Sequence, residues 1–315
     1  MFHALRFMII GHQAQWEFLK KSFELGKIPH AYLFYGPKQI GKKKVAIEFV
    51  KLLFGPENYQ NIEKGIHPDL ILIEPEKGQI QISQIRELKS RFNFYPLAAP
   101  FKVAIIDEAH CINNQAQSSF LKLLEEPKGK TIFILITPFS KMLLPTILSR
   151  TQIVKFYRVP DSEIKRYLQS QNIAEKTVNE IVEFSEGKPG RAIDFLSNSQ
   201  KLEKEKKRLQ EIIKLTNSDL AFRFQYAKNL SKDSRNLTEV LESWTRHFRK
   251  ILISRITRPA IVDDFSAFAR PRLVDETRFR NKLIKTLNLI QKINFLISTT
   301  NINRRLALEI LMLEL

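Results

Sequence analysis

The segment with the clearest chemical potential is the stretch Gly-Pro-Lys-Gln-Ile-Gly-Lys-Lys, which runs from Gly36 to Lys43. It follows an apolar run and precedes a segment with helical periodicity, which is the setting of a phosphate-binding P-loop. Glycines such as Gly36 and Gly41 let backbone N–H groups curl around phosphate oxygens, and a helix N-terminus adds partial positive charge. Lys42 stands where a P-loop lysine reaches the β- and γ-phosphates. The spacing therefore predicts a nucleotide-binding fold.

The residue after Lys42 departs from this pattern. A competent loop has Ser or Thr there, and its hydroxyl binds Mg²⁺. Here the residue is Lys43, whose ammonium group has no lone pair and cannot ligate a metal ion. The substitution favours a nucleotide fold with impaired catalysis, and a fully active ATPase or a chance glycine turn are the alternatives. Residual binding of ATP or ADP without hydrolysis stays open, because Lys42 is retained.

Two further positions could act on phosphates. Asp107 and Glu108 follow the buried run 103–106; in P-loop enzymes an Asp helps to hold Mg²⁺ and a Glu polarises the attacking water. The simpler interpretation is a helix cap at Asp107 and a surface carboxylate at Glu108. Arg150 precedes the last expected strand, from which a guanidinium could reach a phosphate on a neighbouring subunit. Taken alone, Arg150 is more typical of a surface salt bridge.

Metal and aromatic candidates are weak. The single cysteine, Cys111, excludes an internal disulfide and any zinc site built on several thiolates. His110 beside it does not form a metal pair without further ligands nearby. We therefore expect no zinc, no other metal and no resident cofactor. Trp16 and Trp244 each lie on an apolar helical face, which indicates core packing rather than base stacking.

Charge and hydropathy narrow the class of protein. There are 51 Lys and Arg against 33 Asp and Glu, and the net charge of +18 favours a polyanionic partner such as DNA or RNA. The alternative is a source organism whose proteins are all basic. Hydrophobic residues make up 43% of the chain, enough for a sizeable core. No apolar run approaches the roughly 20 residues of a membrane span, and no signal peptide is apparent, so we expect a soluble cytoplasmic protein.

The elements that must position these residues alternate between strand and helix patterns up to about residue 157. The expected strands are 31–35, 70–73, 103–106, 131–137 and 153–156. The expected helices are 12–25, 45–53, 82–94 with Ser83 as its N-cap, and 116–124. Strands that are almost continuously apolar, alternating with helices, predict an α/β module with a parallel sheet covered on both faces.

Beyond about residue 158 the strand signal stops. Short helices are expected at 161–171, 175–185 and 190–196, followed by apolar helical periods over 237–252, 283–290 and 306–313. Pro259 and Pro271 should break a loop between the first two of these periods. The pattern predicts three domains: an α/β module over 1–157, a small helical lid over 158–208, and an all-α domain over 209–315.

Motifs spread along nearly the whole chain resemble the delta-prime and gamma/tau subunits of bacterial clamp loaders, which are AAA+ proteins. They are Gly11-His12 with Gln15, Pro29 to Pro37, His67-Pro68-Asp69, Ile82 to Arg86, Leu121 to Pro127 with its Leu-Glu-Glu-Pro ending, Leu143 to Arg150, Gly187 to Ala192, and Asn301-Ile302-Asn303 with Leu306 to Glu309. The resemblance implies a RecA-like AAA+ module, a helical lid, and a collar that joins five subunits in a ring.

The resemblance also implies roles. Together with gamma/tau and delta subunits, the chain would load a sliding clamp onto primer–template DNA. Arg150 would complete the ATP site of an adjacent subunit in trans, and Arg191 would be a second nucleotide sensor. The damaged P-loop at Lys43 favours the comparatively fixed delta-prime type. The alternatives are an ATP-hydrolysing motor subunit of gamma/tau type and a free-standing DNA-binding AAA+ protein.

Two departures from the family pattern concern cysteine. Relatives usually carry a four-cysteine zinc module between the first helix and the second strand, but residues 55–66 contain no cysteine. That zinc module is therefore absent. A cysteine commonly follows the Ser-Arg pair in relatives, whereas Thr151 follows Arg150 here. The arginine itself is retained, so its assignment is unchanged.

Overall fold

A computed structural model describes residues 9–127, 129–257, 276–300 and 302–315. The chain divides after Ser197 into two compact units. All the described strands belong to the first unit, and the described part of the second unit contains helices as its only regular elements. Pro259 and Pro271, where we expected a loop, lie outside the described residues. No helix in the described part of the chain is both long and apolar enough to cross a membrane.

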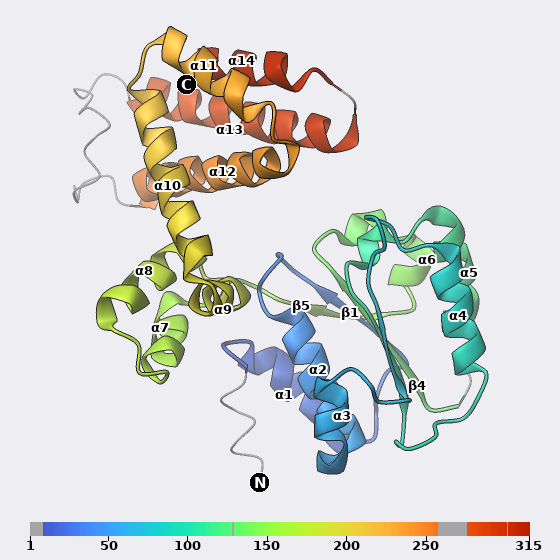
Figure 1. The fold of residues 1–315 in the computed structure, drawn as a ribbon. Coiled ribbons are helices and arrows are strands. Elements are labelled where there is room, and N and C mark those ends of the chain that lie inside the picture. The colour runs from blue at the N-terminus through green and yellow to red at the C-terminus, as the bar shows by residue number, and fades with distance from the viewer. Residues whose placement is uncertain (1–8, 128, 258–275, 301) are drawn as a thin grey trace. The chain divides into compact units, whose positions relative to one another are not determined.

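A five-stranded sheet lies at the centre of the first unit, with the strand order β2-β3-β4-β1-β5 and parallel pairing throughout (Figure 1). The strands are β1 (Ala31–Tyr35), β2 (Leu70–Ile73), β3 (Lys102–Ile106), β4 (Thr131–Thr137) and β5 (Gln152–Lys155). Three strands match their expected ranges residue for residue. β3 begins one residue earlier than expected, and β5 is shifted by one residue. The predicted parallel α/β architecture is confirmed.

Helices cover both faces of the sheet, and Figure 1 shows α1 to α3 on one side and α4 to α6 on the other. The first set is α1 (Gln13–Glu24), α2 (Lys42–Phe54) and α3 (Tyr59–Glu63); the second is α4 (Ile82–Phe92), α5 (Asn114–Glu125) and α6 (Pro145–Leu148). Along β1, Tyr32 and Phe34 join the core under the first set, and Ala31 and Leu33 join the core under the second. Successive strand residues point to opposite faces, so a strand buried on both must be apolar throughout.

Helix α4 departs from the expected boundaries. We expected Ser83 as its N-cap, but Gln81 caps the helix through a capping box with Gln84. The Gln81 backbone is extended, and the two glutamine side chains exchange hydrogen bonds with each other's backbone N–H groups, which places the helix start before Ser83. The helix ends at Phe92 rather than at residue 94.

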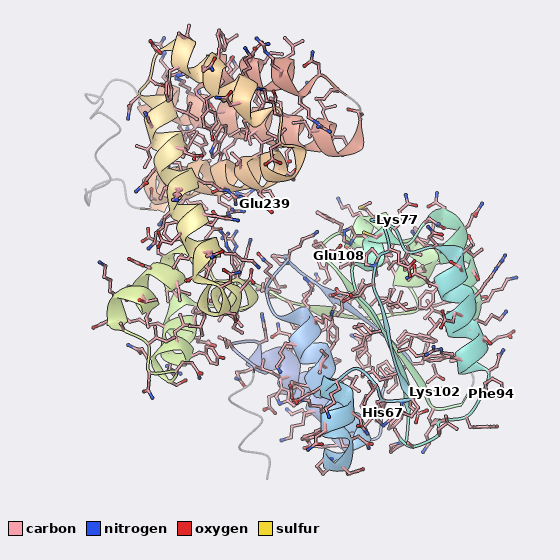
Figure 2. All side chains as sticks on the ribbon, viewed as in Figure 1. His67, Lys77, Phe94, Lys102, Glu108 and Glu239 are labelled. Carbon is pink, nitrogen blue, oxygen red and sulfur yellow. The ribbon has the colours of Figure 1, made fainter. Side chains whose placement is uncertain are left out.

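The loop that follows α4 is held by two buried charges. The Asp69 carboxylate, fully buried, accepts hydrogen bonds from the backbone N–H groups of three successive residues, Leu97, Ala98 and Ala99. The Lys102 ammonium donates to the carbonyl oxygens of Arg91 and Phe94 at 2.8 and 3.0 Å. Figure 2 shows Lys102 and Phe94 at the end of the sheet opposite Glu108.

Three further helices complete the first unit: α7 (Asp161–Gln169), α8 (Glu175–Ser185) and α9 (Pro189–Ser197), which pack in sequence. They correspond to the expected lid helices. The compact unit ends at Ser197, earlier than the expected boundary at 208. The reason is that α10 (Ser199–Thr216) runs through position 208 without a break and contributes Ile212 and Leu215 to the core of the second unit.

The second unit consists of α10, α11 (Leu220–Leu230), α12 (Ser234–Thr257), α13 (Glu276–Thr299) and α14 (Arg304–Glu314). Trp244 is fully buried in its core, as Trp16 is buried in the core of the first unit, and both predictions of core packing are confirmed. The Arg223 guanidinium donates to carbonyl oxygens of Leu215, Thr216 and Met312. This one cation therefore satisfies carbonyls at the ends of two helices.

Candidate functional site

A cavity of about 690 Å³ opens where the strands of the first unit end. The segment 38–44, which runs from the loop after β1 into the first turn of α2, forms one wall. Glu74, Asp107 and Pro138 come from the segments that follow β2, β3 and β4. Figure 2 shows Glu108, another lining residue, at this end of the unit. In parallel α/β sheets, the crevice beyond the carboxyl ends of the strands is the usual ligand site.

Lys42 closes the glycine-containing loop on itself. Its ammonium donates to the carbonyl oxygens of Gly36 and Pro37, at 2.6 Å in both cases, and its side chain is almost fully buried. Burial lowers the pKa of Lys42 to about 8, although Asp107 opposes this shift. Gly41, with φ of 101°, directly precedes α2, and no side chain caps the helix N-terminus. The first backbone N–H groups of α2 are therefore not used by a capping side chain.

Lys43 forms ion pairs at the position where a competent P-loop has its Mg²⁺-binding hydroxyl. Its ammonium contacts a carboxylate oxygen of Glu74 and lies 3.6 Å from Oδ2 of Asp107. The other carboxylate of the cavity, Glu108, forms an ion pair with Lys38 at 3.0 Å. Each acidic side chain that lines the cavity therefore has a lysine partner.

Two other segments hold the loop in place. Nε2 of His12 lies 2.8 Å from the carbonyl oxygen of Ile40, and burial lowers the pKa of this histidine, which favours the neutral ring. At the start of α9, a Cβ atom added to Gly190 would lie 2.7 Å from the carbonyl oxygen of Gln39. Close contact between α9 and the loop therefore requires glycine at this position.

Arg191, the expected second sensor, does not line the cavity. Its side chain is buried, and the guanidinium lies over the Phe195 ring, 5.0 Å from the ring centroid. The structure therefore brings together Gly41, Lys42, Lys43, Asp107 and Glu108 of the predicted residues, while Arg191 lies one residue beyond the lining position Gly190.

Arg150 also lies apart from the cavity. It lies just before the amino end of β5, the edge strand that pairs with β1 in parallel. The P-loop follows the carboxyl end of β1, so Arg150 and the P-loop lie at opposite ends of this strand pair. Its guanidinium forms an ion pair with Glu125 at 3.0 Å and donates to the carbonyl oxygen of Thr146. The side chain remains 37% exposed. Glu125 belongs to the Leu-Glu-Glu-Pro motif, so two separate sequence motifs meet here.

One group of potential metal ligands occurs in the described part of the chain. Donor atoms of Glu108, His110 and Cys111 lie within 4.8 Å of one another. Burial lowers the pKa of His110 and raises that of the Cys111 thiol. The sequence argument considered His110 and Cys111 as a pair and missed Glu108 as a third donor. A closed structural zinc site needs four protein ligands, one more than this group supplies.

Sequence reasoning also missed two ion-pair partners. Glu74 follows the strand 70–73 directly, and this position after a strand was the available signal, because parallel strands deliver such residues to one edge. Glu125 gave no comparable signal, since its pairing with Arg150 depends on how α5 and α6 pack.

Comparisons with known proteins concern mainly the first unit. The protein-family model described as DNA polymerase III, delta subunit, matches residues 11–160. The DNA polymerase III subunit delta' of Bacillus subtilis is 36% identical over 166 residues, which is 50% of this chain and 50% of the relative. The corresponding subunit of Pseudomonas aeruginosa is 34% identical over 134 residues, which is 38% of this chain and 41% of the relative.

A longer match is the DNA polymerase III subunit gamma of Buchnera aphidicola, 29% identical over 234 residues, 68% of this chain and 64% of the relative. The matches thus span 41–64% of the length of these three curated relatives. Among solved structures, a gamma subunit-related protein of Thermotoga maritima is 20% identical, with a TM-score of 0.48, and the match covers 95% of this chain and 97% of that one.

Proposed function

We propose that the chain acts as a clamp-loader subunit of DNA polymerase III, of the delta-prime type. The family model over residues 11–160 and the similarity to delta' and gamma subunits support this role. In this role it assembles with gamma/tau and delta subunits into a pentameric ring that places a sliding clamp on primer–template DNA. It contributes structure and one arginine, and it does not turn over ATP itself.

The observation that carries this proposal is the pairing of Lys43. A hydrolytic site needs Mg²⁺ to offset the charge that develops on the transferred phosphoryl group. Here an ammonium contacts Glu74 and lies 3.6 Å from Asp107, so a metal ion would have to displace it from the acidic side chains. The loop also lacks the hydroxyl that would ligate the metal.

The test is ATP hydrolysis by the purified chain, with and without primed DNA, beside a purified gamma/tau subunit as the positive control. We expect hydrolysis by this chain to be negligible with or without DNA. Turnover of about 1 per second or faster, as in competent enzymes, would identify a motor subunit instead.

Arg150 is the residue that we assign to a partner's ATP site. Three features support this role: it precedes the edge strand of the sheet, it does not line the cavity of its own chain, and its guanidinium is partly exposed. The ion pair with Glu125 and the hydrogen bond to the Thr146 carbonyl oxygen orient the guanidinium, whose planar fork matches the oxygens of an anion. A partner's γ-phosphate is such an anion.

The second unit is the proposed collar. Its last helix, α14, has two apolar faces: Leu308, Leu311 and Met312 are buried in the unit, while Leu306, Ile310 and Leu313 are exposed at a spacing of four and three residues. This spacing places the exposed residues on one helix face, as expected of a surface that packs against another subunit.

A substitution on this face tests the collar. Ile310→Glu places a charge on the exposed face and should prevent co-purification with gamma/tau and delta subunits without lowering the thermal midpoint. Ile66→Glu is the matched control, because Ile66 is exposed in the first unit. If the Ile310 variant assembles normally, α14 does not join the ring.

A further inference from the structure

We propose that the cavity next to Lys43 binds a polyphosphate chain without a divalent cation, and that the Lys43 ammonium takes the place of the metal ion. The inference rests on the proposed role of the P-loop as a site that does not hydrolyse ATP. The ligand class is defined by its linked phosphates, which a nucleotide or an inorganic polyphosphate can supply.

The first argument is the charge of the cavity. Four lysines line it, at positions 38, 42, 43 and 44, together with the three carboxylates of Glu74, Asp107 and Glu108. Lys44 also pairs with the buried carboxylate of Glu48 at 3.0 Å, so the four lysines and the four carboxylates balance without any bound ion. In a magnesium-dependent site the metal ion is the largest local charge, and the protein relies on it to attract the phosphates. Here the Lys43 side chain supplies the charge that offsets Glu74 and Asp107.

The second argument is the position of the Lys43 ammonium. It contacts Glu74 and lies 3.6 Å from Asp107, so it occupies the acidic side of the cavity that a cation would use. Mg²⁺ requires oxygen ligands at about 2.0–2.1 Å in near-octahedral geometry, and an ammonium supplies none. A second cation next to Lys43 would also be repelled. The ammonium can in turn donate hydrogen bonds to a phosphate oxygen while it keeps its carboxylate partners.

The third argument is the supply of hydrogen-bond donors in the loop and at the start of α2. The Lys42 ammonium is bonded to two neutral carbonyl oxygens, from Gly36 and Pro37. Exchanging these bonds for bonds to an anion is favourable, because hydrogen bonds between two charged groups are stronger. The uncapped N-terminus of α2 adds backbone N–H groups. The cavity volume of 690 Å³ lies within the range of about 300–1,000 Å³ that small-molecule sites occupy.

The test is isothermal titration calorimetry on the full chain with ATP, ADP and inorganic tripolyphosphate, each in EDTA and in excess Mg²⁺. We expect ATP to bind in EDTA at least as tightly as in Mg²⁺, within about two-fold. Similar affinities for ATP and tripolyphosphate would show that only the phosphates are recognised, and tighter binding of ATP would add recognition of the nucleoside. Binding that requires Mg²⁺, or no binding at 1 mM ligand, would overturn the proposal.

Two variants of Lys43 separate the ammonium from the rest of the site. Lys43→Met should weaken binding in EDTA by about ten-fold. Lys43→Thr restores the metal-ligating hydroxyl, so its affinity in Mg²⁺ should exceed that in EDTA by about ten-fold. Lys64→Ala, an exposed lysine outside the cavity, is the control and should bind like the wild type. Unchanged affinity of a folded Lys43→Met protein would refute the role of the ammonium.

These measurements use the isolated chain, whereas the clamp-loader role is measured on the rebuilt complex. Failure of metal-free binding therefore leaves the clamp-loader role standing, and failure of assembly or of the Arg150 test leaves metal-free binding standing.

Discussion

The Asp69 carboxylate offers the sharpest stability test, because its whole hydrogen-bonding environment is visible. It is fully buried and accepts hydrogen bonds of 2.7–3.0 Å from the backbone N–H groups of Leu97, Ala98 and Ala99. Burial alone would raise its pKa, but the hydrogen bonds from Ala98, Leu97 and Ala99 together outweigh burial and lower the pKa. The charged form is therefore the one that the fold requires.

Asp69→Asn keeps the shape but removes the charge and replaces one acceptor oxygen with an NH₂ group. The remaining oxygen can take the place of Oδ2, which accepts from all three N–H groups, but the three bonds then go to a neutral acceptor and the NH₂ group faces the Leu97 N–H. Hydrogen bonds to charged groups contribute about 1.5–3 kcal/mol each and ordinary ones about 0.5–1.5 kcal/mol, so we expect a loss of about 3–5 kcal/mol in the free energy of unfolding of the first unit.

The assay is urea unfolding followed by tryptophan fluorescence. The two tryptophans lie one in each compact unit, so a Trp244→Phe background leaves Trp16 as the reporter of the first unit. With a urea slope of about 1–3 kcal/mol per molar, the expected loss moves the midpoint by at least about 1 M. Glu87→Gln, at an exposed residue of α4, is the control and should shift it very little.

The same reasoning fixes the pH dependence. Because the folded pKa of Asp69 is lowered, its stabilisation is present above the unfolded pKa of about 3.9 and is lost as pH falls below it. The difference between wild type and Asp69→Asn should therefore shrink below about pH 4. A midpoint shift smaller than about a third of a molar at pH 7 would refute the account of this loop.

The remaining predictions concern three other residues that pack against neighbouring segments. Burial lowers the pKa of His247 from 6.5 to about 4, so between these pH values only the unfolded chain binds its proton. As pH falls through this window, the second unit should lose up to about 3 kcal/mol, and His247→Leu should remove that part of the slope in urea unfolding reported by Trp244. Gly190→Ala brings a methyl group against the Gln39 carbonyl and should destabilise the first unit by about 1–3 kcal/mol, measured by Trp16 fluorescence. Arg223→Met leaves three carbonyl oxygens without this donor and should cost the second unit about 2–4 kcal/mol in the same denaturation assay.

Much of the fold was predictable from local pattern, for a physical reason. β1 and residues 132–136 of β4 are apolar without interruption because these strands are buried on both faces, and a change in polarity marks their ends. Helix α4 was harder, because a glutamine at the N-cap is unusual and Ser83 looked like the better cap. The end of the first compact unit at Ser197 was not visible in the sequence, because it depends on α10 running on without a break and contributing Ile212 and Leu215 to the second core.

The candidate site also has parts that the sequence predicts and parts that it does not. The placement of Gly36 to Lys43 between a strand and a helix follows from sequence order alone. The partners of Lys43 do not, because Glu74 is 31 residues away and reaches it only through the order of the strands in the sheet. The two apolar faces of α14 are likewise distinguishable only after one face is packed, since the sequence shows apolar residues on both.

The central claim is that this chain serves a partner's ATP site through Arg150, and one reconstitution tests it most directly. A complex is rebuilt from wild-type partners and the Arg150→Ala chain, with Arg166→Ala, an exposed arginine of α7, as the control. Assembly should be unaffected, because a partly exposed ion pair such as Arg150–Glu125 contributes about 1 kcal/mol or less.

An arginine finger contributes roughly 10³–10⁵ in rate at one site, and the loss for a complex with several sites should be smaller. We expect DNA-stimulated ATP hydrolysis and clamp loading to fall with Arg150→Ala and to be only partly restored by Arg150→Lys, because an ammonium lacks the planar fork of a guanidinium. Unchanged hydrolysis and clamp loading, in an Arg150→Ala complex shown to be fully assembled, would contradict the claim.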